Sequence, residues 1–571
     1  MSPQTLTHSR EKLRYDPQAI ASYYRHRPWS AWARALRVIG GLGKFVLSLK
    51  WDEWFNKPGH QGKRATQLRQ LLTRLGPTFI KVGQALSTRP DLIRKDFLEE
   101  LVKLQDQLPP FDNAIAYRII ETQLDRSIEE IFSELSPKAV AAASLGQVYR
   151  GRLHSGEEVA VKVQRPNLRP TLSLDLYLMR WAASWLSPWL PLNLGHDLTM
   201  IVDEFGTKLF EEIDYLNEGR NAEKFATNFR NDPQVKVPAI YWRYTSNNVL
   251  TLEWLNGFKL NDTENIRAAG LDPEEIIKIG VTSGLQQLLE HGFFHADPHP
   301  GNLFAMPDGK MGYIDFGMMD QLNENTKETL VDAVVDLVNQ DYNDLAEDYV
   351  KLGFLAPNTD IRPIVPALEI LLGNAISQNV GDFNFKIITD QFSELMYDYP
   401  FRVPAKFALI IRSLVTQEGI ALSLNRNFKI VEVAYPYVAR RLLTGESRQL
   451  RRRLLNILFK DGKFQWERLE NLIAIARTDS SFDVLPTARL GIEYLLSKEG
   501  QFLRRQLVLA LTEDDRLHTE QVQRLWELVK DDLQPNRILD VAFSMLTEFS
   551  REGAAAMLPK ATSFFPTAQN K

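Results

Sequence analysis

The chain has 571 residues, enough for several buried cores, and its 68 basic and 72 acidic side chains leave a net charge of −4. That balance argues against a protein that binds nucleic acid through bulk positive charge. The sequence contains no cysteine, which excludes disulfides, thiolate zinc sites, iron–sulfur clusters and cysteine nucleophiles. With 44% hydrophobic and 25% charged residues, the composition is typical of a folded chain.

The N-terminal segment lacks an apolar core, so we expect no secretory signal there. Between Tyr23 and Trp54, aromatic residues are interleaved with arginines and lysines. This pattern is typical of a helix that lies in a lipid headgroup layer, although a helix packed on its own domain would also show it. The segment from Trp181 to His196 has the same two interpretations. It is too short to span a bilayer, and two prolines interrupt it. We predict no transmembrane helix and a peripheral membrane surface as a partner.

In chain order, residues 64–106 have helical apolar spacing, with breaks at Gly76-Pro77 and at Arg89-Pro90-Asp91. The runs "GQVYRGRL" and "EEVAVKVQ" then alternate with period two around the turn "HSGE". This alternation predicts a β-hairpin.

A helical stretch from Leu172 to about Phe229 follows, and "NNVLTLEWLNG" then returns to strand character. After Gly257 we predict helices almost throughout, apart from one short strand pair near Leu303–Ala305 and Met311–Ile314. Helices before, inside and after one block of strands predict an α+β fold.

A phosphate-handling pattern begins with "AAASLGQVYRGRLHSGEEVAVK", which aligns with the glycine-rich loop of protein kinases and the following V-A-I-K strand. The residues that fall in register with the loop are Ala141, Ala143, Gly146 and Val148, with alanine at the first two glycine positions. Ala160 and Lys162 share one face of the second strand. That face can present a small residue to a purine and an ammonium to phosphates. Taken alone, Lys162 is equally well an exposed strand lysine.

A second set of motifs follows in the order that protein kinases show. Asp297 and Asn302 lie five positions apart, and Asp315-Phe316-Gly317 comes after a short hairpin. Asp315 and Asn302 offer hard oxygens to Mg²⁺, which bridges nucleotide phosphates. Asp297 can orient or deprotonate a phosphoryl acceptor. The combined order of loop, lysine, D-x-x-x-x-N and D-F-G predicts a kinase-like nucleotide site.

Lys162 also needs an acidic partner in such a site. The helical segment "FEEIDYLNEGRNAEKF" offers four carboxylates: Glu211, Glu212, Asp214 and Glu218. The sequence does not choose among them, and a solvated acidic helix face is the alternative interpretation.

Three histidines at four-residue spacing, His291, His295 and His299, would share one helix face and form a transition-metal site. Pro298 and Pro300 obstruct a helix through this stretch, so we expect that face not to form. We then expect His295 to hold the catalytic loop, His299 to lie near phosphates and His291 to end the preceding helix.

Together with "FIKVGQALSTRPDL", these motifs resemble the UbiB family of atypical, aarF-domain-containing kinases over roughly residues 64–430. The matching motifs are K-x-G-Q (Lys81 to Gln84), an alanine-rich loop (Ala141 to Gln147), E-x-D (Glu212 to Asp214) and H-x-D-P-H-P-G-N (His295 to Asn302). The resemblance implies a protein-kinase-like bilobal fold with helical extensions at both ends.

The same resemblance implies a division of the chain into five parts. They are a basic and aromatic helical segment (1–63), the K-x-G-Q extension (64–135), an N-lobe with a helical insert (136–258), a C-lobe (259–430) and a C-terminal helical region (431–571).

The resemblance further implies roles for single residues. Glu218 would pair with Lys162, and Lys81 would contact Glu212 and Asp214, so that the K-x-G-Q helix takes the space of a peptide substrate. The residues implied to act in catalysis are Lys81, Lys162 and Asp297, with Gln84, Glu212, Asp214, His295 and His299 around them. The residues implied to bind ATP or ADP are Ala141, Ala142, Ala143, Ser144, Gly146, Val148, Ala160, Lys162 and Glu218, with Glu253 and Leu255 at the adenine hinge and Mg²⁺ on Asn302 and Asp315.

Members of the family are ATPases or kinases of unsettled substrate, linked to ubiquinone, plastoquinone or tocopherol metabolism and lipid homeostasis. "YDPQAIASYYRHRPW" is most similar to cyanobacterial and plastid members, which implies peripheral attachment to the cytoplasmic face of a membrane, at a thylakoid or plastoglobule-like surface. One alternative is a nucleotide-switched, non-catalytic scaffold for prenyl-lipid enzymes. Another is a kinase of a soluble small molecule, similar to aminoglycoside phosphotransferases, which would leave K-x-G-Q unexplained.

The sequence departs from ordinary protein kinases in its catalytic loop. Ala296 replaces the arginine before the catalytic aspartate, and His299 replaces the lysine two residues after it. No A-P-E motif follows Gly317, and we expect "MMDQLNENTKETLVDAVVDL" to run straight into helix. Protein kinase activity in trans is therefore not expected.

Overall fold

The computed structural model describes residues 13–55, 61–87, 94–104, 110–187, 198–377, 399, 401–425, 428, 430–444 and short pieces between 458 and 523. The chain forms two compact units. Unit 1 comprises Met1–Thr329, Tyr349–Ala375 and Phe383–Lys429, and unit 2 comprises Leu330–Asp348, Ile376–Asp382 and Ile430–Lys571. The predicted break at Arg89-Pro90-Asp91 and the end of the Trp181–His196 segment lie outside the described residues.

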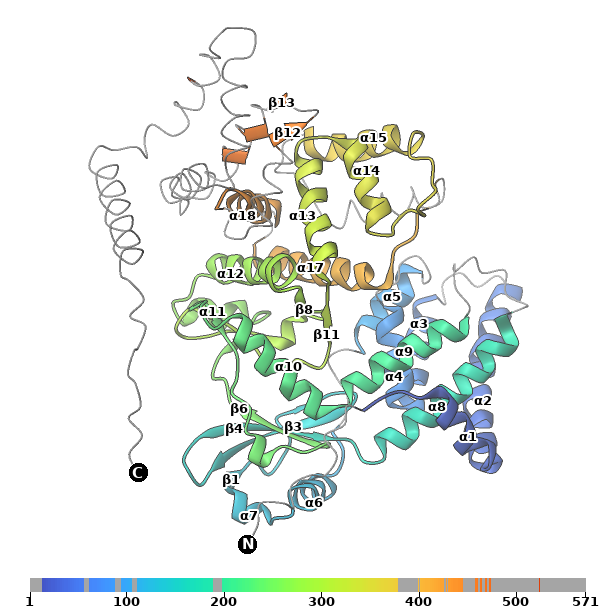
Figure 1. Ribbon diagram of the computed structural model, residues 1–571. Coiled ribbons are helices and arrows are strands. Elements are labelled where there is room, and N and C mark those ends of the chain that lie inside the picture. The colour runs from blue at the N-terminus through green and yellow to red at the C-terminus, as the bar shows by residue number, and fades with distance from the viewer. Residues whose placement is uncertain are drawn as a thin grey trace, which may run out of the picture. The chain divides into compact units, whose positions relative to one another are not determined.

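A five-stranded antiparallel sheet forms the first lobe of unit 1 (Figure 1). Its strands are β1 (Phe132–Leu135), β2 (Ala141–Ala142), β3 (Gly146–Leu153), β4 (Glu158–Gln164) and β6 (Val249–Glu253), in the order β1-β3-β4-β6 with β2 also paired to β3. The predicted hairpin and returning strand are confirmed. We did not predict β1 and β2, because runs of four and two residues are too short to show an alternation.

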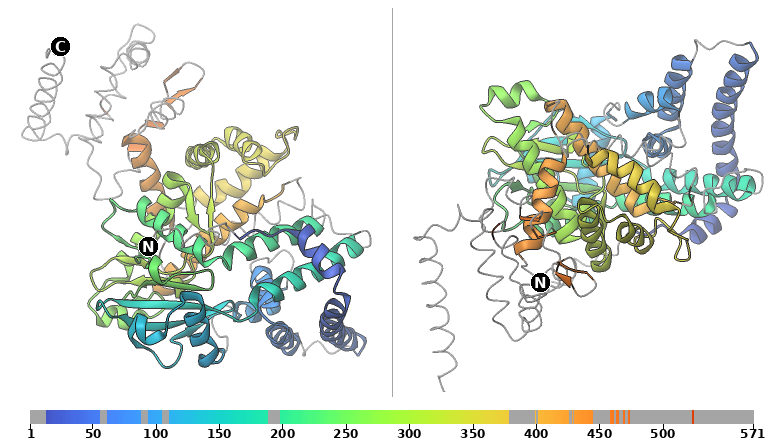
Figure 2. Two further views of the ribbon diagram at one scale, coloured as in Figure 1. Left: turned by 60° about the horizontal axis from the view of Figure 1, so that its bottom comes forward. Right: turned by 90° about the horizontal axis from the view of Figure 1, so that it is seen from above.

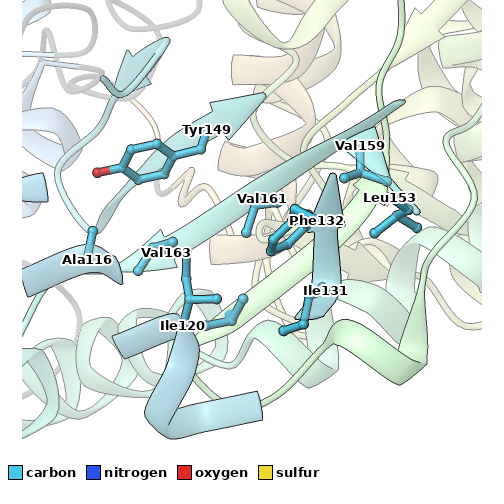
Figure 3. Packing of buried hydrophobic residues seen from close by; sticks show 10 residues of the cluster. Ala116, Ile120, Ile131, Phe132, Tyr149, Leu153, Val159, Val161 and Val163 are labelled. Atoms are coloured by element: carbon cyan, nitrogen blue, oxygen red, sulfur yellow. The ribbon is translucent and has the colours of Figure 1, made fainter. Parts of the chain in front are cut away.

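Helices cover both faces of this sheet (Figure 1). On one face, Val159, Val161 and Val163 of β4 pack against Ala116 and Ile120 of α6 (Asn113–Leu124), next to the short α7 (Ile128–Ile131) (Figure 3). On the other face, a smaller apolar cluster joins Ala160, Leu250 and Leu252 to Tyr215 of α10 (Tyr215–Asn228). The alternation of β4 therefore directs Lys162 toward α10, and the predicted shared face of Ala160 and Lys162 is confirmed.

The N-terminal extension is helical, as predicted. It consists of α1 (Pro17–Arg25), α2 (Pro28–Trp54), α3 (Gln61–Leu75), α4 (Pro77–Leu86) and α5 (Lys95–Val102). The break between α3 and α4 falls at Gly76, whose φ of 104° excludes most side chains, and Pro77 starts the next helix. A core of leucines with Phe79 and Ile80 joins α3, α4 and α5.

The helical insert between β4 and β6 contains α8 (Leu168–Leu186) and α9 (Leu198–Glu212) ahead of α10. Leu172 and Leu176 of α8 pack against Leu209 and Phe210 of α9. Figures 1 and 2 show these two helices beside the N-terminal ones.

The second lobe of unit 1 combines helices with short strands. Its helices are α11 (Thr263–Ala268), α12 (Pro273–Gln286), α15 (Ile364–Ser377) and α17 (Ala405–Leu424). One sheet has the order β5 (Val235–Lys236), β10 (Met311–Tyr313), β9 (Leu303–Ala305) and β7 (Phe258–Lys259), and β8 (Phe293–His295) pairs with β11 (Met319–Gln321). The β9–β10 pair was predicted, whereas β7, β8 and β11 were not, because strands of two or three residues are too short to show an alternation.

One expectation for this lobe was wrong. The chain after Gly317 does not run straight into helix, because Met319–Gln321 first pairs antiparallel with Phe293–His295, and α13 (Glu324–Val338) begins only afterwards. The ladder to β8 supplies the backbone hydrogen bonds that a helix would otherwise provide. α13 and α14 (Tyr342–Lys351) each belong partly to unit 1 and partly to unit 2.

Unit 2 is described only in part. Besides the shared helices it contains α18 (Ile430–Thr444) and a hairpin of β12 (Phe459–Lys460) and β13 (Lys463–Phe464). Arg468 makes an ion pair of 2.5 Å with Asp341.

Among the described helices, the stretch Lys406–Leu424 of α17 is the one long and apolar enough to cross a membrane by length and composition, and 44% of it is buried within the protein. Arg412, in the middle of this stretch, is ion-paired to Asp297. A buried helix that carries a paired arginine is typical of a protein core, so α17 is weak evidence for a membrane span.

Candidate active site

Lys162 of β4 lies between two carboxylates. Its Nζ is 2.5 Å from Oε1 of Glu218 on α10 and 3.8 Å from Oδ2 of Asp315. Of the four acidic residues that the sequence left open, Glu218 is therefore the close partner, as the family resemblance implied. The ion pair joins the sheet to α10 at the start of the D-F-G turn.

One face of α10 holds the D-F-G turn in place. Asn221 donates to the carbonyl of Phe316 at 3.0 Å, and the ring of Phe225 packs 5.4 Å from the ring of Phe316. Oε1 of Glu218 also accepts from the Phe316 N–H at 3.5 Å. Residues 218, 221 and 225 recur at helical spacing, so a single helix face organises both Lys162 and Asp315.

The two carboxylates around Lys162 have pKa values that move apart. Burial raises the pKa of Glu218 to about 7, although Lys162 opposes this shift. Burial acts in the same direction on Asp315, but Lys162 and the Gly317 N–H hold the pKa of Asp315 below its ordinary value. Two carboxylates that share one cation cannot both ionise easily. Asp315 is thus the group that stays charged for a cation.

The catalytic loop is irregular, as the prolines predicted. His295 ends β8, and its buried Nδ1 accepts from the Asp297 N–H at 3.1 Å. Burial lowers the pKa of His295, so the ring is neutral and its proton lies on Nε2. This contact agrees with the expected role of His295 in holding the loop.

The β9–β10 hairpin brings Asn302 and Asp315 to its open end. Leu303 pairs with Tyr313, and the N–H of Ile314 donates to the Asn302 carbonyl at 3.2 Å. Asn302 directly precedes β9, and Asp315 follows β10 by two positions. The hairpin therefore brings these two predicted Mg²⁺ ligands to the same end of the sheet, although they lie thirteen positions apart in the chain.

The donor set fits Mg²⁺ bound together with phosphates. Asp315 uses Oδ1 to accept from the Gly317 N–H at 2.9 Å, and its side chain remains 39% exposed. In the described part of the chain, no group of three or more His, Cys, Asp or Glu side chains could hold a metal ion. Mg²⁺ commonly takes one or two protein oxygens and completes its shell with water and phosphate oxygens, which this donor set allows.

The three histidines do not form a metal site. His291 ends a π-helical turn (Gln287–His291), and its ring packs 5.0 Å from that of Phe229. The Nδ1 atom of His299 accepts from the Gly301 N–H at 3.1 Å, so that His299 caps the start of a 3-10 turn (Pro300–Asn302). The placement of His299 near phosphates stays a prediction.

The K-x-G-Q helix α4 reaches the site through Lys81, which forms an ion pair with Glu212. The expected contact between Lys81 and Asp214 was wrong. Asp214 instead caps α10 by accepting from the Asn217 N–H, and it also accepts from the N–H of Leu13. Asp214 is the N-cap residue of α10, and its carboxylate therefore bonds to the first turn of that helix and not to Lys81.

Gln84 bonds α4 to the segment after α5. Its Nε2 donates to the carbonyl of Leu104 at 2.9 Å. Gly83 allows this close packing, since a Cβ there would lie 2.5 Å from Leu104 and 2.9 Å from Leu72. The K-x-G-Q motif therefore combines one residue of the site with two that pack α4 on its neighbours.

The alanine-rich loop is a closed turn between β2 and β3. The Ala143 N–H donates to the Gly146 carbonyl at 2.8 Å, and Arg165 donates to the Ala143 carbonyl at 3.0 Å. Ala141 pairs with Val148, and Ala142 with Gln147. Ser144 is buried.

Gly146 and the hinge residues each lie in a crowded position. A Cβ at Gly146 would lie 2.7 Å from the Val163 carbonyl and would meet the Tyr215 hydroxyl. At the hinge, the Glu253 side chain forms an ion pair with Lys236, and the backbone N–H of Glu253 donates to the Ala239 carbonyl at 2.8 Å. Leu255 is buried. That Glu253 and Leu255 bind adenine stays a prediction.

Sequence reasoning missed Arg412, whose Nη2 lies 2.8 Å from Oδ1 of Asp297. The signal was present in "AKFALIIRSLVTQEGIALSL", where Arg412 lies in the middle of a largely apolar helix that also carries Lys406 and Glu418. A charge on a largely buried helix usually has a partner. Arg165 and Tyr215, beside the alanine-rich loop, were also missed. With these contacts, fold and site together place the chain in the protein-kinase-like class.

Comparisons with known proteins agree with that class. Residues 103–349 match the ABC1 atypical kinase-like domain. An uncharacterised protein of Synechocystis sp. is 69% identical over 548 residues, which cover 96% of this chain and 97% of that protein. Protein ACTIVITY OF BC1 COMPLEX KINASE 1, chloroplastic, of Arabidopsis thaliana is 46% identical over 541 residues, covering 91% of this chain and 79% of that protein.

Among solved structures, the complex of Rv3197 with erythromycin from Mycobacterium tuberculosis matches with a TM-score of 0.45 and 28% identity, covering 65% of this chain and 94% of that one. The sequence relatives decide the assignment: this chain belongs to the ABC1 family of atypical kinase-like proteins, also called the aarF or UbiB family. The resemblance seen in the sequence motifs is thereby confirmed.

Proposed function

We propose that the chain is an atypical kinase or ATPase, which binds Mg²⁺-ATP at this site and transfers or hydrolyses the terminal phosphoryl group. The observation that carries the proposal is the position of Lys162 between Glu218 and Asp315 at the D-F-G turn. Asp315 and Asn302 would hold Mg²⁺, which when bound neutralises charge on the phosphates. A site of this kind acts mainly by positioning and electrostatics.

The other residues take roles that follow from their positions. Lys162 binds phosphate oxygens while Glu218 fixes its direction. Asp297 orients the acceptor hydroxyl or water, or takes its proton. Ala160 and Val148, on the α10 side of the sheet near Leu250 and Leu252, form an apolar seat for the purine together with the hinge at Glu253 and Leu255.

The acceptor is proposed to be water or a small molecule and not a protein. The Lys81–Glu212 pair lies beside the D-F-G turn, since the Glu212 Cγ is 3.6 Å from the position of a Cβ on Gly317. α4 thus occupies the approach that a peptide would use. The family resemblance supports a role in prenyl-lipid metabolism, covering quinones or tocopherol. The chloroplastic relatives support a location at a plastid-type membrane, such as a thylakoid or plastoglobule-like surface.

ATP turnover with Mg²⁺ tests the proposal. We expect Asp315→Asn to abolish turnover, because it removes the charged ligand. The control Asp308→Asn lies in the turn of the same hairpin, where Asp308 pairs with Lys310 at 2.7 Å, and should keep full turnover. Equal turnover in wild type and Asp315→Asn would reject this site. Nucleotide binding with no turnover in the wild type would favour the second candidate, a nucleotide-switched scaffold for prenyl-lipid enzymes.

We also propose that α2 docks on an anionic bilayer. One face of α2 packs on the protein, where Gly41 brings it close to Leu71 of α3. The opposite face stays exposed and apolar: Trp32 is 60%, Leu36 67%, Leu47 69% and Trp54 84% exposed. This observation favours the lipid interpretation of the aromatic segment over packing on its own domain.

The charge along this helix matches anionic lipid. From Pro17 to Trp51, which covers α1 and α2 up to its last turn, the sequence contains six basic residues and no acidic one; Asp52, in the last turn of α2, pairs with Arg64. Arg34 is paired with Asp175, and the other five are exposed. Tryptophan beside exposed arginine and lysine is typical of helices at a membrane interface.

Sedimentation with phosphatidylglycerol-containing vesicles tests the docking. The double variant Leu36→Gln/Leu47→Gln should lose most vesicle binding, and Ile370→Gln, equally exposed on α15, should keep it. Equal sedimentation of all three proteins would disprove docking through α2. Binding to neutral vesicles of phosphatidylcholine alone should be weaker, because the basic residues then have no anionic partner.

A further inference from the structure

The catalytic loop receives a cation from a distant helix. Arg412 of α17 donates from Nη2 to Oδ1 of Asp297 at 2.8 Å, and the two side chains are only 15% and 24% exposed. They lie 115 positions apart in the chain. Because the pair is partly buried, water and salt screen it less than a surface ion pair, and removing one partner would leave a poorly solvated charge.

The loop itself supplies no such cation. Residues 293–302, "FFHADPHPGN", contain neither lysine nor arginine. Two further cations of the site are held by carboxylates, Lys81 by Glu212 and Lys162 by Glu218 and Asp315. A third, Arg165, donates to the Ala143 carbonyl of the alanine-rich loop. A phosphoryl group beside Asp297 would therefore meet a carboxylate, unless another residue balanced its charge.

Arg412 has donors to spare for that purpose. A guanidinium has five N–H donors and always keeps its charge. Within the described part of the chain, the hydrogen bond to Asp297 is the one that Arg412 makes. One edge of the fork therefore serves Asp297, and the remaining donors face no protein acceptor among these residues.

The position of Arg412 is fixed by its helix. α17 packs on α12 so closely that a Cβ on Gly284 would lie 2.7 Å from the amide of Gln417. Ser413, Gln417 and Glu418 on α17 are buried. A rigid helix holds a binding group more accurately than a loop does.

Resting on the proposed function, we propose that Arg412 is a phosphate-binding residue of this site. It holds Asp297 with one edge of its guanidinium and binds the terminal phosphate of ATP with the other. Arg412 neither gives nor takes a proton. It contributes the positive charge that Ala296 and His299 do not provide, and its ligand is a nucleoside triphosphate in preference to a diphosphate.

Binding of Mg²⁺-ATP and Mg²⁺-ADP to the full chain tests this proposal. We expect Arg412→Met to weaken ATP binding about ten- to hundredfold, the range for a lost hydrogen bond to a charged group, and to leave ADP binding within about threefold. A purely structural arginine would change both affinities together. Lys406 lies on the same helix but bonds to the Gln321 carbonyl, so Lys406→Met should change the affinity for neither ATP nor ADP.

Further readouts separate the possible failures. Melting shows whether Arg412→Met folds, and if it does not, Arg412→Lys keeps the ion pair and should show a smaller loss confined to ATP. Parallel losses for ATP and ADP, or an unchanged ratio in a folded variant, would overturn the role of Arg412. Added methylguanidine should restore part of the turnover of Arg412→Ala. If the wild type binds no ATP, or Asp315→Asn turns it over normally, it is the proposed function that fails.

Discussion

Glu218 and Asp315 share Lys162, and this shared cation links protonation to metal binding. Burial brings the pKa of Glu218 to about 7, whereas the pKa of Asp315 is lowered. A Mg²⁺ ion on Asp315 adds positive charge near Glu218 and so favours its ionised form. A proton should therefore leave Glu218 when Mg²⁺-nucleotide binds.

We predict that binding of Mg²⁺-ADP releases protons near pH 7. Glu218 is about half protonated there in the free protein and ionised in the complex, so affinity should rise as pH rises through about 7 and level off above it. Calorimetry in two buffers of different ionisation enthalpy measures the release. Glu218→Gln should abolish it, and Glu211→Gln, on the neighbouring surface of α9, should not. Proton uptake, or equal release in Glu218→Gln, would contradict the coupling.

Residues that act through short sequence spacing were predictable. The positions of Lys162, Asp297 and Asp315 follow from strand alternation and from motif order, and Glu218 follows from the family resemblance. Arg412 and Asp175 could not be found in this way, because their partners lie 115 and 97 or more positions away. Motif spacing carries no information on such contacts. The failed contact of Asp214 has the same origin, since capping of α10 competes for that carboxylate.

Elements differ in how much of their formation is local. Long helices such as α2 and α8 are marked by periodicity and prolines, and the β3–β4 hairpin by alternation around a glycine turn. The short strands β1, β8 and β11 exist only because a partner strand offers hydrogen bonds. The position of α4 depends on a single residue, because only a glycine at position 83 lets α4 pack this closely on Leu104 and Leu72.

We predict opposite effects for alanine at two helical glycines. Gly83→Ala should lower the free energy of unfolding by about 1–3 kcal/mol through overpacking, because its Cβ would meet Leu104 and Leu72. A Cβ on Gly419 of α17 would meet no atom of the described residues within 4 Å. Gly419→Ala should therefore raise the free energy of unfolding by up to about 1 kcal/mol. Urea denaturation measures both changes. If Gly83→Ala were as stable as Gly419→Ala, α4 would not pack as described.

At the scale of unit 1, one hydrogen-bonded path joins α2, the helix proposed to dock on lipid, to the candidate site. Arg34 of α2 binds Asp175 of α8 at 2.7 and 2.9 Å, and the same buried carboxylate accepts from Thr78 of α4 at 2.6 Å. Lys81 follows Thr78 by one helical turn and pairs with Glu212. A shift of α2 on a bilayer would therefore pull on α4 and on the D-F-G turn.

We predict that anionic vesicles raise ATP turnover and that Thr78→Val removes most of this stimulation. The valine keeps the shape of threonine but loses the bond to Asp175, so α2 and α4 would move independently. Asp175 remains held by Arg34, which limits the stability loss to about 1–3 kcal/mol. Vesicle binding and turnover without lipid should stay near wild type. A path of contacts becomes evidence of coupling only through such a measurement.

Thr66→Val is the matched control, because among the described residues the Thr66 side chain bonds to the Gly62 carbonyl alone, within α3. This variant should leave the stimulation intact. Stimulation of Thr78→Val to the wild-type level would show that the path carries no coupling, and so would a wild type that vesicles bind but do not stimulate. Loss of stimulation together with loss of vesicle binding would instead place the effect in docking. Because Thr78 touches neither lipid nor nucleotide in the proposed arrangement, a selective loss would assign α4 the role of transmitting the state of α2 to Glu212.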